Sequence, residues 1–144
     1  MTAVHRGLPS LVSLVFLAGC IHPRPMRSSD AHGERTVLTE EQINRTGASN
    51  AWDVLKRLAP QFSFSEDRNG QPRRLERRGR SSILLSDAPL VFVDGTEMAD
   101  FKALSQISAS TLSSIEILGG IDGTTYYGSN AVSGVILIHT KNGS

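Results

Sequence analysis

Residues 115–141, IEILGGIDGTTYYGSNAVSGVILIHTK, decide the fold of this chain. Two short runs rich in β-branched residues, 115–118 and 135–140, flank a segment that is crowded with glycine, serine and threonine. Runs of this kind favour β-strands, and glycine adopts at little cost the positive φ angles that tight turns need. The stretch therefore predicts a strand, a compact glycine-rich excursion and a second strand.

Two short helices are predicted near the start of the domain. Thr39 followed by Gln42 has the pattern of a capping box, which predicts a helix over residues 40–45. Asn50 precedes residues 51–59, whose apolar side chains share one helical face, so a second helix is expected there. On that face we expect the single tryptophan to be a core anchor and not a ligand-stacking residue.

Short strands and a turn fill the middle of the chain. Alternating apolar residues predict a strand over 61–65, a polar loop follows it through Pro72, and brief apolar runs predict strands at 83–85 and 90–93. Asp94 and Gly95 follow the last run and predict a turn in which the Asp94 carboxylate accepts hydrogen bonds from backbone N–H groups. With roughly three or four short helices among these mixed strands, the fold class is α+β in a single small domain.

The N-terminal residues have the pattern of an export signal. The apolar core at 11–18 is shorter than the ~18 residues that cross a bilayer, and residues 17–20, Leu-Ala-Gly-Cys, resemble a bacterial lipobox. We expect a lipoprotein signal peptide at 1–19, a lipidated Cys20 on a flexible tether at 20–36, and the domain at 37–144. The alternative is an ordinary secretory signal with an incidental cysteine. Because Cys20 is the only cysteine, a disulfide within the chain is excluded.

Charge and residue spacing argue against several function classes. The net charge of +1 gives no broad basic field, so nucleic acid is not an expected partner. His139 ends an apolar strand and is expected to be a rim or core histidine and not a catalytic base. His22 and His32 lie in the tether without acidic or cysteine partners at metal-ligand spacing. We therefore expect no enzyme activity, no cofactor and no metal site.

An arginine-rich stretch stands out between residues 68 and 80, with six arginines and one glutamate. A solvated loop would explain it. The alternative is a docking surface, because arginine pairs well with carboxylates and phosphates. On that hypothesis the partner-binding residues are Arg73, Arg74, Arg77, Arg78 and Arg80.

Five segments in order resemble the plug domain of TonB-dependent outer-membrane receptors. They are AWDVLKRLAP at 51–60, Arg-Gly-Arg-Ser at 78–81, PLVFVDG at 89–95, LSSIEIL at 112–118, and Tyr-Gly-Ser through Thr-Lys at 127–141. The resemblance covers about residues 40–142 and implies the plug fold and an outer-membrane location. In such receptors the plug fills a barrel that opens when TonB pulls. Up to Ser144 this sequence shows neither a series of barrel strands nor a convincing TonB box, so we expect a plug-like domain without a barrel of its own.

The resemblance leaves three functional hypotheses. The first is a lipid-anchored protein of the outer membrane, its domain facing the periplasm, that docks with a separate barrel or with the TonB machinery during nutrient uptake. The second is a small lipoprotein that captures a siderophore or an oligosaccharide, with Tyr126 and Tyr127 as stacking surfaces. The third is a receptor remnant. In all three, Asp94, Gly95, Gly128 and Gly134 are expected to shape turns and not to bind ligand.

Overall fold

The computed structural model describes residues 34–79 and 87–143. The predicted signal peptide, Cys20, the predicted strand at 83–85 and Arg80 lie outside the described residues. The strands are β1 (Arg35–Thr39), β2 (Phe62–Glu66), β3 (Pro72–Arg77), β4 (Leu90–Val93), β5 (Thr96–Glu97), β6 (Leu112–Leu118) and β7 (Val135–Thr140). The helices are α1 (Glu40–Arg45), α2 (Ala51–Leu58) and α3 (Gly120–Tyr127), with short 3-10 turns η1 (Phe101–Ser105), η2 (Ala109–Thr111) and η3 (Ser129–Ala131).

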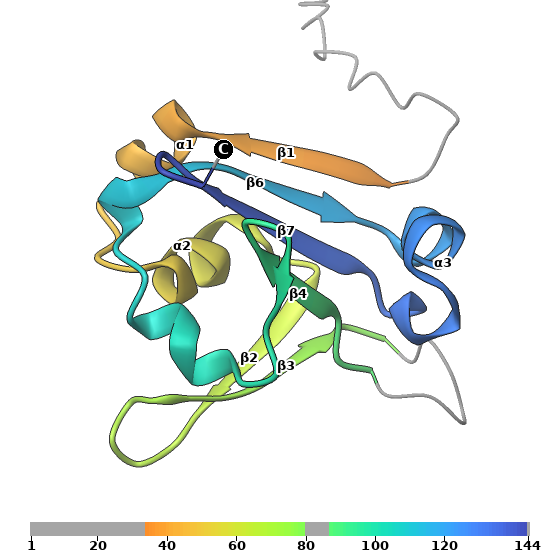
Figure 1. The fold of residues 1–144 in the computed structure, drawn as a ribbon. Coiled ribbons are helices and arrows are strands. Elements are labelled where there is room, and N and C mark those ends of the chain that lie inside the picture. The colour runs from red at the N-terminus through yellow and green to blue at the C-terminus, as the bar shows by residue number, and fades with distance from the viewer. Residues whose placement is uncertain (1–33, 80–86, 144) are drawn as a thin grey trace, which may run out of the picture.

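Five strands form one mixed sheet in the order β1-β6-β7-β4-β5, and β2 pairs with β3 in a separate antiparallel hairpin. β7 lies at the centre: it pairs antiparallel with β6 and parallel with β4. Helix α2 and the hairpin lie on one side of this sheet, and α3 lies at one end of it (Figure 1). This arrangement confirms the predicted α+β class.

The core lies between the sheet, α2 and the hairpin. Its fully buried large side chains come from every one of these elements and include Trp52, Phe62, Leu75, Ile115 and Ile136. Trp52 is only 2 % exposed and packs edge-on against Phe64, with ring centroids 5.1 Å apart. The expectation that this tryptophan anchors the core is therefore confirmed.

Local capping signals account for the start of both N-terminal helices. The Thr39 hydroxyl accepts from the Gln42 amide, and the Gln42 side chain accepts from the Thr39 amide, which closes the capping box of α1. The Asn50 side chain accepts from the Asp53 amide at 2.9 Å and caps α2. These bonds satisfy amides that have no partner inside the helix, so each helix begins where the sequence indicates.

The polar region after residue 66 forms a turn at 67–71, as expected, but the residues that follow this turn form a strand and not a loop. Residues 72–77 form strand β3, which pairs with β2 residue by residue from Phe62–Arg77 to Ser65–Arg74. Leu75 is fully buried while Arg73 and Arg74 are exposed. Pro72 and Leu75 are the two buried residues of the strand, and the hydrophobic signal of Leu75 is hidden by the charged residues on both sides.

The glycine-rich excursion after residue 118, for which the sequence predicts turns, contains helix α3. Glycine is a poor helix former, so propensity alone argues against this helix. Here the glycines serve close packing instead. A Cβ on Gly123 would come 2.7 Å from the Ala131 carbonyl oxygen, and one on Gly120 would collide with the Val132 carbonyl oxygen. The helix forms because its glycine face lets it lie directly against η3.

Candidate functional site

Asp94 fastens two strands together at one end of the sheet. Asp94 and Gly95 both have positive φ, +48° and +80°, and together they link β4 to β5 as a two-residue hairpin turn. The Asp94 carboxylate accepts from the Thr140 amide at 2.8 Å and from the Thr140 hydroxyl at 2.7 Å. These hydrogen bonds hold the pKa of Asp94 below its ordinary value. The carboxylate is thus engaged with the end of β7, where it ties the sheet together.

Gly128 lies immediately before η3 in the chain, and Gly134 lies shortly after it. Gly128 has φ +82° and ψ −176°, a region that is open essentially to glycine alone. Gly134 has φ +101°, and a Cβ there would come 2.6 Å from the Leu118 carbonyl oxygen. The chain needs both glycines to turn from α3 through η3 into β7.

The predicted docking arginines are spread along β3 and the residues after it. Arg77 pairs with Glu34 at 2.9 Å, and the Arg78 Nε donates to the Phe62 carbonyl oxygen at 2.9 Å. Arg74 lies 3.4 Å from Glu76. Since a strand advances ~3.4 Å per residue, Arg73 and Arg77 lie at opposite ends of β3. The described arginines therefore make separate contacts and do not form one compact patch.

Helix α3 carries three of the four exposed large apolar residues in the described part of the chain. Ile121 is 77 % exposed and Tyr126 is 74 % exposed. Tyr127 is less open because its ring packs on Phe92, with centroids 5.0 Å apart. Ile121 also lines a shallow groove, together with Arg77, Gly120, Thr124 and Val132. The two tyrosines that were predicted together therefore differ: Tyr127 has an aromatic partner within the domain, and Tyr126 faces solvent.

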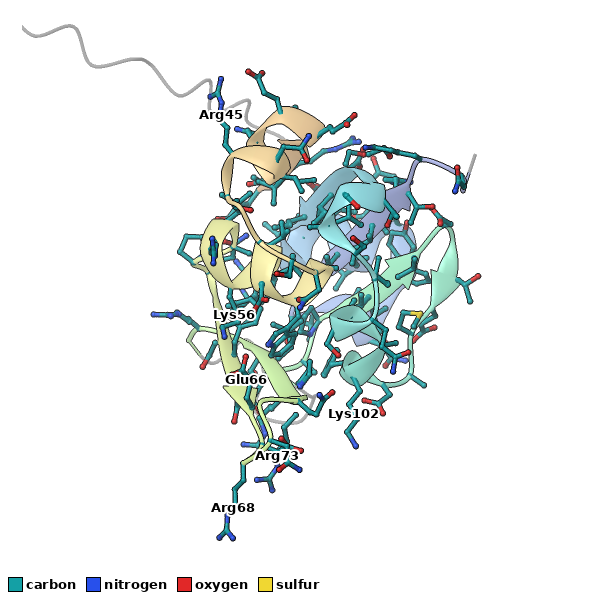
Figure 2. All side chains as sticks on the ribbon, turned by 90° about the vertical axis from the view of Figure 1, so that its left-hand side faces the viewer. Arg45, Lys56, Glu66, Arg68, Arg73 and Lys102 are labelled. Carbon is teal, nitrogen blue, oxygen red and sulfur yellow. The ribbon has the colours of Figure 1, made fainter. Side chains whose placement is uncertain are left out.

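A polar cluster on α2 and β2 had no signal in the sequence. One Glu66 carboxylate oxygen accepts from the Trp52 indole N–H at 2.7 Å and from the Lys56 ammonium at 2.6 Å. Figure 2 shows Lys56 and Glu66 side by side on the outer face of the domain. The hydrogen bonds from Lys56 and Trp52 lower the pKa of Glu66. The cluster fixes the hairpin to α2, and no sequence spacing pairs residues of a helix and a strand in this way.

Within residues 34–79 and 87–143, no group of three or more histidine, cysteine or acidic side chains is placed to hold a metal ion. None of the helices in this part of the chain is long and apolar enough to cross a membrane. No cofactor or metal chemistry emerges from the described side chains. The open surface of the described residues includes apolar groups at α3 and cations on the hairpin.

Sequence comparison identifies a matching domain family and several related proteins. The family profile described as TonB-dependent Receptor Plug Domain matches residues 27–135. The TonB-dependent receptor P26 of Formosa agariphila is 30% identical over 120 residues, which cover 82% of this chain and 12% of the relative. The TonB-dependent receptor SusC of Bacteroides thetaiotaomicron is 27% identical over 126 residues, 82% of this chain and 13% of the relative. The chain thus spans about an eighth of the length of these relatives.

Solved structures agree with the sequence comparison. The RagAB peptide importer in its open-open state superposes with a TM-score of 0.59 at 25% identity, over 76% of this chain and 12% of that one. The siderophore receptor PirA from Acinetobacter baumannii gives a TM-score of 0.54 at 22% identity, over 75% of this chain and 17% of that one, and shows the shared fold. The family profile, the curated relatives and the fold all identify the same domain: the chain belongs to the TonB-dependent receptor plug domain family.

Proposed function

We propose that this protein is a non-enzymatic docking module of TonB-dependent uptake, held at the outer membrane by a lipid on Cys20 with its domain in the periplasm. Its partner is a separate outer-membrane barrel or a protein of the TonB system. Plug family membership supports the setting. The observation that carries the proposal is the exposed apolar surface of α3, with Ile121 77 % and Tyr126 74 % exposed.

Exposed apolar groups of this size are typical of surfaces that contact another molecule. The same end bears Arg77, which borders the groove and is paired with Glu34. An apolar centre with an arginine at its edge has the composition of a protein–protein interface. Arg74 on β3 is a separate docking candidate, because it is exposed and can pair with a carboxylate on a barrel wall.

A crosslinking pull-down from native envelopes tests this proposal. The double variant Ile121→Ser/Tyr126→Ser removes the apolar groups from α3 and should lose a co-purifying barrel or TonB-system protein. The matched control is Val37→Ser, which removes an exposed apolar group from β1 at 46 % exposure. Loss in the double variant with retention in the control supports docking through α3. Equal recovery from both would refute it.

The arginine hypothesis needs its own variants. Arg78 donates to the backbone of β2, so its replacement tests the fold and not the interface. Arg74→Glu changes an exposed side chain whose only described ion pair is to its neighbour Glu76 on the same strand. If Arg74→Glu leaves the pull-down unchanged, Arg74 does not serve docking.

Ligand capture is the second candidate, and the exposed ring of Tyr126 on α3 favours it. A siderophore or oligosaccharide that stacks on an open aromatic ring would use this end of the domain. Relatives give the ligand classes to try first, since PirA is described as a siderophore receptor and RagAB as a peptide importer. A rise in melting temperature with one class, lost in Tyr126→Ser, supports capture. No shift with any class and no recovered partner would favour a receptor remnant.

A further inference from the structure

Three cations gather at the end of the domain that lies away from α3. Arg68 lies in the turn of the β2–β3 hairpin, Arg73 lies at the start of β3, and Lys102 lies in η1, and all three are exposed. We call this set the cationic end. Figure 2 shows the three side chains projecting outward from the hairpin and from the neighbouring η1. A contact between the Ser105 hydroxyl and the Gln71 side chain at 3.4 Å joins the two segments.

The carboxylates of this end are already engaged. Asp67 accepts from the amides of Asn69 and Gln71 at 2.8 and 2.9 Å, which fixes the hairpin turn. Asp100 accepts from the Lys102 amide at 2.9 Å and caps η1. Glu66 is held by the Trp52 indole and the Lys56 ammonium. These acids weaken the long-range field of the cations, so any attraction here acts at short range.

The cations themselves have no ion partner in the part of the chain that is described. Among the residues of that part, no ion pair within 4.0 Å involves Arg68, Arg73 or Lys102, whereas Arg35, Arg45 and Lys141 each pair with a glutamate. Lys102 and Arg73 act on Asp67 only through space. Their donors are therefore open to anions from outside the domain.

The surroundings of these cations decide which anion fits. A protein partner normally needs a buried apolar or aromatic anchor. The exposed large apolar residues in the described ranges are Val37, Ile121, Tyr126 and Tyr127, and none lies on the hairpin or η1. A convex end that offers cations without an apolar anchor suits a flat surface of many anionic groups. We propose that the cationic end rests on a membrane surface through the phosphates of anionic lipid headgroups.

This contact would orient the domain. With the hairpin against lipid, α3 and its apolar groups at the other end point away from the membrane (Figure 1). The inference does not depend on docking through α3, because it uses different residues and a different partner. A negative result for one of these two surfaces therefore does not contradict the proposal for the other.

Vesicle co-sedimentation of the full chain tests the proposal. Cys20→Ser is included in every protein so that no acyl chain contributes to binding. The test variant is Arg68→Gln/Arg73→Gln/Lys102→Gln, and the matched control is Arg35→Gln/Arg45→Gln/Lys141→Gln, which removes three cations that are already paired. Each protein is measured with phosphatidylcholine vesicles and with vesicles that also contain phosphatidylglycerol, and circular dichroism verifies that both variants are folded.

We expect tighter binding to the phosphatidylglycerol vesicles, weakened by salt. A cation near an anionic surface contributes about fivefold in affinity, so the test variant should lose about 100-fold. Both variants lower the net charge by three, but the control should lose far less, since its three cations are already paired with glutamates and lie outside the cationic end. Equal losses in the two variants, or equal binding to neutral vesicles, would overturn the proposal. Unchanged vesicle binding with loss of a co-purifying acidic protein would assign these cations to a protein partner instead.

Discussion

Replacing Gly134 by alanine should strongly destabilise the domain, and the structure separates two contributions to that loss. The first is the backbone: φ of +101° is unfavourable for any L-side chain and costs about 1–3 kcal/mol. The second is steric: the new Cβ would lie 2.6 Å from the Leu118 carbonyl oxygen in the neighbouring strand β6. Forcing a methyl group into a packed site costs about 1–3 kcal/mol more. The expected loss is therefore about 2–6 kcal/mol.

Gly128→Ala is the matched control, because it carries only the first contribution. Its φ is +82°, and nothing lies within 4 Å of the position that a Cβ would take there. Gly134→Ala should therefore lose about 1–3 kcal/mol more than Gly128→Ala. In a domain of this size each kcal/mol lowers the melting temperature by roughly 4–8 °C.

Urea unfolding followed by tryptophan fluorescence measures both variants. The chain has a single tryptophan, Trp52, which is 2 % exposed and reports directly on the core. The midpoints and slopes of wild type, Gly134→Ala and Gly128→Ala give the two free-energy differences. Equal destabilisation by the two substitutions would refute the reasoning, since it would mean that β6 moves aside at no cost.

Three further outcomes are expected. Glu66→Gln should flatten the acid dependence of the free energy of unfolding, because Lys56 and Trp52 lower the pKa of Glu66. The contribution of Glu66 to stability is complete above its unfolded-state pKa of about 4.3 and is lost as the pH falls through the lower folded-state pKa. Urea unfolding across the acidic range checks this, and an unchanged slope of stability against pH would contradict it. Asn50→Ala should cost about 1 kcal/mol by removing the α2 cap, measured by urea unfolding, and an unchanged midpoint would speak against it. Phe62→Ala should cost about 3–5 kcal/mol because this ring is fully buried, and a loss below about 1 kcal/mol would show a core that closes over the cavity.

The sequence predicted best those elements whose signals are local. Thr39 and Asn50 cap helices within a few residues of themselves, so α1 and α2 begin as expected. Asp94 and Gly95 turn the chain by their own backbone preferences. β3 was missed because its only buried residues are Pro72 and Leu75, and Leu75 lies among charged neighbours. α3 was missed because its glycines are explained only by the carbonyl groups of Ala131 and Val132, which lie beyond the helix in the sequence.

The candidate surfaces were predictable only in part. Residue types drew attention to the arginines and to Tyr126 and Tyr127, but spacing in sequence does not reveal which side chains share a face. The structure separates Arg73 from Arg77 along β3 and brings Arg73 to the end where Lys102 lies. Tyr127 is matched with Phe92, a contact between β4 and α3 that no local pattern contains. Surface composition follows from tertiary placement, which a linear pattern does not encode.

The central place of β7 has a consequence for how the domain is made. Without residues 135–140 the five-stranded sheet falls into two separate pairs, β1 with β6 and β4 with β5. Pairing over such long sequence separations is slow, because loop-closure entropy is lost before the contacts form. The five-stranded sheet therefore cannot be completed until β7, the last strand in the sequence, is available to join the two pairs.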